Sequence, residues 1–287
     1  MCIKETTEFK EKHREVTMKY RYVADCHVHT DCSKDAVDPA MMMCESAARL
    51  GLYALTVTDH CECNVFLSEG YDKSVIQSYF EAKKAAAVFG GRLHVFAGVE
   101  LGQPMQDTDA ANRVLDSCGF DFVLASVHNI KNKKDFFGLD YSEENIDDLL
   151  GCYFDEIMET IEWGRFDSLS HLTYPWRYIV GEHHISIPEQ RWKARIDDVL
   201  KALIRNGKAL EVNTSGFRQE LGVSMPDLPV LERYHELGGK LVTLGSDAHR
   251  WADVGAGIEL GLDVLLKAGF HHYMIYISHQ PKALPIG

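Results

Sequence analysis

Short apolar runs alternate with amphipathic segments along most of the chain. The apolar runs predict β-strands, and their near-continuous hydrophobicity is typical of parallel strands buried on both faces. Seven runs end in polar residues: 21–29, 53–60, 93–100, 121–128, 166–171, 209–215 and 240–249. An eighth strand candidate, 273–278, lacks a polar end.

Segments with helical periodicity lie between these strands. One helix is predicted to start with Asp38 as its N-cap and Pro39 in its first turn, and to stop at Gly51. Residues 172–187 read as a long loop. The other predicted helices are 73–89, 108–118, 143–163, 189–206, 226–238 and 252–268.

Repeated strand–helix units predict an α/β fold with a parallel sheet and helices outside. A closed or nearly closed barrel accommodates these units better than an open sheet. We expect an N-terminal extension at 1–20 and a single barrel domain at 21–287. No glycine-rich G-x-G-x-x-G turn follows a strand, which disfavours a dinucleotide-binding fold.

The net charge and the length of the apolar runs limit the kinds of ligand and cellular location that we expect. The formal net charge is −13, which argues against nucleic acid as a ligand, because that affinity rests largely on Lys and Arg. No apolar run approaches the ~20 residues of a membrane span. The charged start lacks a secretory signal, so we expect a cytoplasmic protein with reduced cysteines, as a monomer or a homodimer.

Polar residues that bind metals collect at the strand ends. Six of the 14 histidines end a predicted strand, and in a barrel all these ends meet at one face. His27 and His29 point to the same side because their spacing is two residues. Asp247 and His249 repeat this spacing. The full set at or just after the strand ends is His27, His29, Asp31, Asp35, Asp59, His60, Glu100, His128, His171, Asn213, Asp247 and His249.

Such a cluster is hard to explain as packing. Buried imidazoles and carboxylates are costly unless a cation neutralises them. The mixture of imidazole and carboxylate suits Zn, Mn or Fe better than Ca or Mg. The sequence therefore predicts a site for divalent metal ions at the carboxyl ends of the strands.

The chain resembles the polymerase-and-histidinol-phosphatase (PHP) superfamily of metal-dependent phosphoesterases. The motifs DCHVHT, TVTDH, GVE, SVH, LSH and GSDAH occur in the family's order between residues 25 and 249. The resemblance implies a distorted seven-stranded (β/α) barrel, TIM-like, with up to three metal ions. Many relatives have a histidine where this chain has Asp35.

The resemblance also implies a ligand set for each of the three ions. Glu100 would bridge the first two ions. His27, His29, Glu100 and Asp247 would bind the first ion, Glu100, His128 and His171 the second, and Asp35, His60 and His249 the third.

Within the superfamily, the chain is most similar to the PHP-type histidinol-phosphate phosphatases. Their two phosphate-binding arginines correspond here to Arg177, in SHLTYPWRY, and Arg218, in EVNTSGFRQ. Arginine suits this role because its planar fork donates two hydrogen bonds to phosphate. The implied reaction is hydrolysis of L-histidinol phosphate, a step of histidine biosynthesis, by a metal-bridging hydroxide. Asp247 or a bound water would protonate the leaving group.

Two alternatives stay open from the sequence alone. The same site could act on another small phosphate ester, such as a nucleotide or phosphotyrosine. The domain could instead be a non-catalytic module stabilised by metal. We expect 61–63, a Cys-Glu-Cys run, to be an ordinary loop of small and polar side chains.

Overall fold

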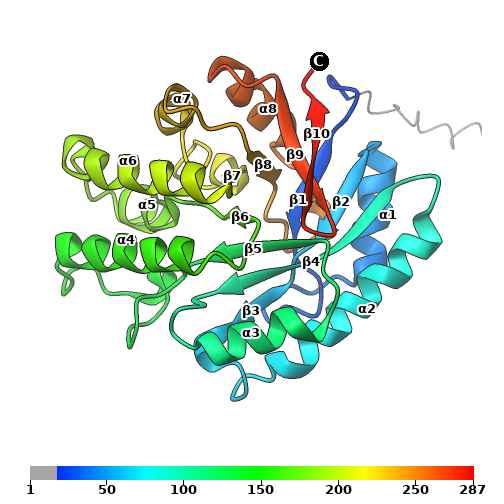
Figure 1. Cartoon of the computed structure of the whole chain (residues 1–287), viewed down its shortest axis with the longest axis horizontal. Helices are drawn as coiled ribbons and strands as arrows, with labels where there is room; N and C mark the ends of the chain where they lie inside the picture. The colour runs from blue at the N-terminus through cyan, green and yellow to red at the C-terminus, as the bar shows by residue number, and fades with distance from the viewer. Residues whose placement is uncertain (1–17) are drawn as a thin grey trace, which may run out of the picture.

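Seven strand positions form a nearly closed parallel barrel with helices on its outside (Figure 1). The computed structural model describes residues 18–287, apart from the side chain of Glu189; residues 1–17 of the predicted extension lie outside the described residues. The sheet order is β1-β2-β4-β5-β6-β7-β8, with β3 paired to β4. The strands are β1 Ala24–Val28, β2 Ala54–Val57, β3 His60–Glu62, β4 His94–Gly102, β5 Phe122–Ser126, β6 Ser168–Leu169, β7 Ala209–Asn213 and β8 Val242–Gly245.

The barrel closes between β1 and β8, at their carboxyl ends. Val28 forms a parallel bridge with Ala248. The Asp247 amide donates to the His27 carbonyl at 2.8 Å, and the His29 amide donates to the Ala248 carbonyl at 2.9 Å. These bonds place the first and last predicted metal-site motifs side by side.

The second predicted strand is broken in two. Both β2 and β3 pair with β4, so together they fill one position in the barrel. At the break, Thr58 hydrogen bonds to β1: its amide donates to the Val28 carbonyl at 2.8 Å and its hydroxyl accepts from the Val28 amide at 3.1 Å. The chain then resumes with His60 paired to Glu100, which brings two predicted metal ligands together.

Six of the seven longer helices in residues 18–287 lie within three residues of their predicted ranges, but the last begins at Ile258, six residues later than predicted, and the cap of the first is wrong. Pro39 occupies the N-cap position of α1, and no side chain caps this helix. The Asp38 carboxylate instead accepts from the Trp251 amide at 2.8 Å, so it joins α1 to the segment after β8. Gly51 ends α1 in the left-handed conformation, and the helix stops there as predicted.

The helices are α1 Ala40–Leu50, α2 Tyr71–Phe89, α3 Thr108–Ser117, α4 Ile146–Trp163, α6 Glu189–Asn206, α7 Leu228–Glu236 and α8 Ile258–Lys267. None of the helices in residues 18–287 is long and apolar enough to cross a membrane.

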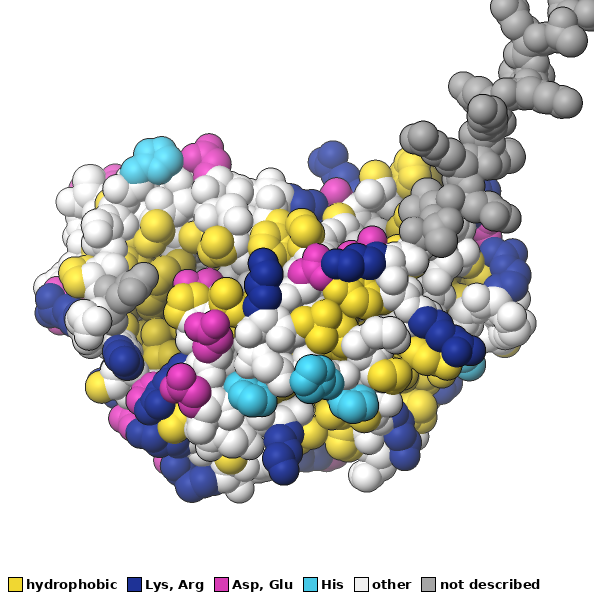
Figure 2. Space-filling model, turned by 90° about the horizontal axis from the view of Figure 1, so that it is seen from above, with side chains coloured by type: hydrophobic (Ala, Val, Ile, Leu, Met, Phe, Trp, Pro, Cys, Tyr) yellow, Lys and Arg dark blue, Asp and Glu magenta, His cyan; other side chains and the backbone are white. Residues whose placement is uncertain are grey.

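The prediction of a loop at 172–187 is wrong, because much of this segment is helical. It contains the short α5, Tyr174–Trp176, followed by a π-helix at Arg177–Glu182. Tyr174 and Tyr178 are buried on one side of this helical segment. Its opposite side, with Trp176 and Val180, lines a second pocket of about 560 Å³ between α6 and α7. Figure 2 shows hydrophobic side chains gathered in a hollow on this side of the molecule.

The eighth strand candidate lies outside the barrel. It forms β9, His272–Ile277, which pairs antiparallel with β10, Gln280–Pro285. The Tyr273 hydroxyl accepts from the Ala24 amide at 2.7 Å and donates to the Tyr22 carbonyl at 2.8 Å. The hairpin therefore packs against the start of β1, which explains why this strand has no polar end at the site.

Candidate metal centre

All nine predicted metal-site residues come together at the carboxyl ends of the strands. A pocket of about 860 Å³ opens there. His27 and His29 are completely buried and lie beside Glu100, which lines this pocket. The pocket wall includes the other seven, which are Asp35, His60, Glu100, His128, His171, Asp247 and His249.

Glu100 lies at the centre of the cluster and is completely buried. Its Oε2 is 3.2 Å from His27 Nε2, 3.5 Å from His29 Nε2 and 2.9 Å from His60 Nδ1. His27 Nε2 and His29 Nε2 face each other at 3.0 Å. Two facing imidazole nitrogens beside a carboxylate oxygen form a group that could hold one metal ion.

The other oxygen of Glu100 faces a second pair of imidazoles. Glu100 Oε1 is 3.0 Å from His171 Nε2 and 3.2 Å from His128 Nε2. These two nitrogens are 3.3 Å apart. Glu100 therefore has the geometry expected of a carboxylate shared between two metal positions.

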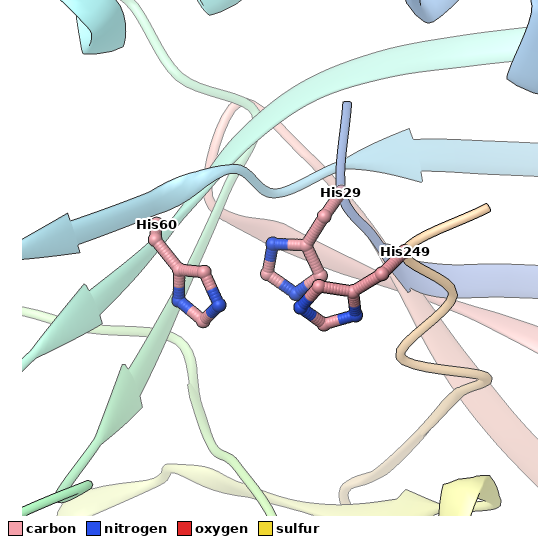
Figure 3. Close-up of side chains that lie close together, drawn as sticks. All are labelled: His29, His60 and His249. Carbon is pink, nitrogen blue, oxygen red and sulfur yellow. The ribbon is translucent and has the colours of Figure 1, made fainter. Parts of the chain in front are cut away.

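A third group lies nearer the pocket mouth. The His29 ring stacks against His60 at 4.1 Å and against His249 at 4.2 Å, measured between ring centroids (Figure 3). Asp35 Oδ2 is 3.1 Å from His249 Nε2 and 3.5 Å from His60 Nε2. Asp247 Oδ1 is 3.3 Å from His29 Nε2. Asp35 thus reaches the cluster.

The charges inside the cluster are strongly coupled. Burial alone would raise the pKa of Glu100, but His27, His128 and His60 hold it well below its ordinary value. Burial and the neighbouring imidazoles lower the pKa of His29 well below its ordinary value. A lowered pKa favours the neutral imidazole, the form that coordinates metals.

Two buried polar atoms in the cluster have no hydrogen-bond partner: Glu100 Oε2 and His60 Nδ1. Buried polar atoms nearly always have a hydrogen-bond partner, and a bound ion is one of the accepted explanations for an exception. These two atoms face each other with the Nε2 atoms of His27 and His29 beside them. The donor set of imidazole nitrogens and carboxylate oxygens fits divalent transition metals.

A buried glutamate that could not be assigned from the sequence contacts the imidazole of one predicted ligand and the backbone amide of another. His27 Nδ1 donates to Glu211 Oε1 at 2.7 Å, which leaves His27 Nε2 free to coordinate. Glu211 Oε2 accepts from the His171 amide at 2.8 Å. Carboxylates in this position fix the tautomer and orientation of metal-binding histidines. Its only sequence signal was a charged residue inside an otherwise apolar strand.

The prediction of an ordinary loop at 61–63 is also wrong. His60–Glu62 is strand β3, and Cys61 and Cys63 are completely buried. The alternating direction of strand side chains turns Glu62 toward the site, where Glu62 Oε1 accepts from His128 Nδ1 at 3.0 Å. Gln103 then donates to the other oxygen of Glu62.

Ser33 fixes the tautomer of His29. Its hydroxyl donates to Asp59 Oδ1 at 2.7 Å, and its oxygen accepts from the His60 amide at 3.0 Å. His29 Nδ1 is 3.3 Å from the same oxygen. Because the Ser33 proton is directed to Asp59, His29 Nδ1 is the donor, and the His29 Nε2 lone pair faces the cluster.

The two predicted arginines line the same pocket. Arg177 lies in the π-helix, with its guanidinium carbon 5.1 Å from the Tyr178 ring centroid. Its Nε is buried without a hydrogen-bond partner. Arg218 is held by the backbone, since Nη2 donates to the Ser246 carbonyl at 2.9 Å. Both arginines therefore line the pocket that also contains the clustered histidines.

The fold and this site define a class of protein: an α/β barrel with a buried histidine–carboxylate centre suited to divalent metals. The PHP domain model matches residues 25–215. The chain belongs to the PHP family.

Two curated relatives cover most of the chain. It is 28% identical over 254 residues to a probable histidinol-phosphatase of Thermotoga maritima, covering 88% of this chain and 94% of the relative. It is 29% identical over 256 residues to a histidinol-phosphatase of Lactococcus lactis subsp. lactis, covering 86% and 91%.

A solved structure shares the fold. It is a histidinol phosphate phosphatase from Lactococcus lactis subsp. lactis, in complex with zinc, L-histidinol and phosphate. The TM-score is 0.75 at 24% sequence identity, and the alignment covers 91% of this chain and 98% of that one. This likeness confirms the predicted distorted seven-stranded barrel.

Proposed function

We propose that the chain is a metal-dependent phosphomonoesterase that hydrolyses L-histidinol phosphate to L-histidinol and phosphate. The observation that carries the proposal is the position of Glu100, whose two oxygens face two separate imidazole pairs at the base of a pocket lined by Arg177 and Arg218. The names of the two curated relatives support this substrate.

Divalent ions held by the nine residues would act as Lewis acids and lower the pKa of bound water. Arg177 and Arg218 would bind the phosphate. A phosphate oxygen would give the buried Arg177 Nε the acceptor that the protein does not provide. Arg218 is already oriented by the Ser246 carbonyl, so it would bind phosphate with little reorganisation.

We assign proton transfer at the leaving oxygen to Asp247. Its Oδ1 faces the imidazoles of His27 and His29. Its Oδ2 has only long contacts, 3.4 Å to Asn213 Nδ2 and 3.5 Å to the Ser215 hydroxyl. Oδ2 is therefore the atom we expect to exchange a proton with the substrate or with a water beside it.

A substrate panel tests the reaction. The protein, loaded with Zn or Mn, should release phosphate from L-histidinol phosphate with a higher kcat/KM than from a nucleoside monophosphate, phosphotyrosine or p-nitrophenyl phosphate. A preference for a nucleotide or phosphotyrosine would replace the proposed substrate with one of those classes. Bound metal without turnover of any ester would indicate a non-catalytic module.

Arg177→Ala tests the phosphate contact. Charge-assisted hydrogen bonds contribute about 1.5–3 kcal/mol, so kcat/KM should fall about 10- to 100-fold. Arg195→Ala is the matched control, because Arg195 is exposed on α6 and pairs with Asp155 at 2.8 Å, outside the pocket. Equal activity of the Arg177 and Arg195 variants would remove Arg177 from the site.

A further inference from the structure

The carboxylates that line the pocket have different electrostatic surroundings. Four of these carboxylates lie among the clustered histidines or accept hydrogen bonds from them. A fifth, Asp253, has its Oδ1 3.9 Å from Arg218 Nε. Asp135 alone among the pocket carboxylates of residues 18–287 has no ion pair. The six carboxylates are Asp35, Glu62, Glu100, Asp135, Asp247 and Asp253.

Asp135 is fixed in place by the strand end that carries His128. Residues Asn129 and Asp135 form an antiparallel bridge, and the Phe136 amide donates to the His128 carbonyl at 3.0 Å. Asp135 Oδ1 accepts from the Phe137 amide at 2.8 Å. No hydrogen bond to Oδ2 occurs in the described part of the chain. One carboxylate oxygen is therefore occupied by the protein, and the other is available to a ligand.

Asp135 lies one phenol ring away from the proposed metal ligands. The Tyr174 ring centroid is 4.8 Å from that of His171 and 5.2 Å from that of His128. The Tyr174 hydroxyl donates to Asp135 Oδ1 at 3.1 Å. A group bound at Asp135 would therefore be close to a phosphate bound at the imidazole cluster.

Three aromatic side chains lie close to this carboxylate or to the tyrosine that binds it. The hydroxyls of Tyr174 and Tyr178 are 3.1 Å apart. Phe137 lines the pocket although it is 73% exposed, and its ring centroid is 6.1 Å from that of Tyr178. A carboxylate among aromatic rings suits an organic cation, because the ring faces attract positive charge.

We propose that Asp135 binds the ammonium group of the substrate, so that the pocket selects phosphate esters of amino alcohols whose amine is on the carbon next to the phosphorylated one. The inference rests on the proposed function and deepens it. An ammonium group neutralises Asp135, whereas an ester without the amine brings its phosphate dianion near an uncompensated carboxylate. Asp135 therefore favours the correct substrate by attraction and disfavours others by repulsion.

Asp135→Asn tests this role, because asparagine keeps an oxygen acceptor for Tyr174 and the Phe137 amide but loses the charge. Turnover of L-histidinol phosphate is compared with that of imidazolylpropyl phosphate, which lacks the amine. The ratio of the two kcat/KM values should fall about 10-fold or more, as for loss of a charged hydrogen bond. Asp140→Asn is the matched control, because Asp140 is exposed in the same connection after β5 and does not line the pocket.

Binding measured by calorimetry on the zinc-loaded protein separates this inference from the proposed function. Asp135→Asn should weaken L-histidinol binding about 10-fold, with a much smaller effect on inorganic phosphate. That result would support the amine contact even if no ester were hydrolysed. Equal losses of kcat/KM for L-histidinol phosphate and imidazolylpropyl phosphate would overturn the assignment of Asp135. Unchanged L-histidinol binding in the variant would also overturn it.

Discussion

Glu211→Gln should weaken metal binding although Glu211 is not itself a predicted ligand. Glu211 is buried and contacts two different predicted ligands: Oε1 accepts from His27 Nδ1 at 2.7 Å, and Oε2 accepts from the His171 amide at 2.8 Å. Both partners are donors, so the position requires an acceptor on each side. A carboxylate meets this requirement, whereas an amide has one acceptor and one donor.

Either orientation of the new amide disturbs the site. If its oxygen faces His27, its NH₂ group meets the His171 amide, and two donors oppose each other in a buried position. If its NH₂ group faces His27, that imidazole must accept at Nδ1 and carry its proton on Nε2, the atom that faces Glu100. The loss of such supporting carboxylates typically costs 10- to 100-fold in metal affinity, or about 1.4–2.8 kcal/mol.

Metal affinity of the Glu211→Gln variant can be measured by competition with a chelator of known affinity, followed by metal analysis. Phosphatase activity at saturating metal is measured in parallel. Glu162→Gln, an exposed substitution on α4, is the matched control. A Glu211→Gln protein that folds normally and binds metal within about twofold of the unchanged chain would refute the tautomer argument, because the expected loss is at least about 10-fold.

Three further predictions concern stability. Gly216→Ala places a Cβ 2.1 Å from the Val223 carbonyl oxygen and should lower Tm by about 4 °C or more. The control Gly151→Ala meets no atom within 4 Å and should raise Tm slightly; equal Tm values for the two variants would contradict the steric argument. Asp197→Asn should cost about 0.5–1 kcal/mol at neutral pH in denaturant unfolding, because Asp197 forms paired hydrogen bonds with Arg233 at 2.9 and 2.8 Å. Arg233 lowers the pKa of Asp197 below its ordinary value, so this stability is present above the unfolded pKa of about 3.9 and is lost as the pH falls below it; a difference that persists in acid would contradict the assignment. Chelation should lower Tm in a calorimetric scan, and added Zn or Mn should restore it, since ions that bind only the folded state stabilise it; an unchanged Tm would argue against a bound metal.

The barrel and a cluster of polar residues at its mouth could be predicted because both depend on local pattern, and the family resemblance implied which nine residues make up the metal site. Apolar strands followed by polar ends identify the carboxyl mouth, and two-residue spacing places His27 and His29 on one side. Glu211 could not be assigned this way. Its hydrogen bond to His27 spans 184 positions and depends on β7, β8 and β1 lying side by side as the barrel closes.

Glu62 and the 174–182 helix were missed for related reasons. The ligand set implied by the resemblance was complete without residues 61–63, and only the pairing of β3 with β4 shows that Glu62 lies in a strand facing the site. In the other segment, Pro175 lies in the first turn of α5, a position that proline tolerates in a helix. Burial of Tyr174 and Tyr178 stabilises this helix, and that tertiary packing has no local signal.

Metal binding and barrel closure are coupled by the same bonds. The hydrogen bonds that join β1 to the end of β8 also bring His29 Nε2 within 3.3 Å of Asp247 Oδ1. His27 and His29 cannot both be protonated at Nε2, because these nitrogens face each other at 3.0 Å. Protons alone therefore do not neutralise the buried carboxylates as well as divalent cations would. Cations at this position would hold together the two strand ends where the barrel is completed, so one site would contribute to both the stability of the chain and the proposed chemistry.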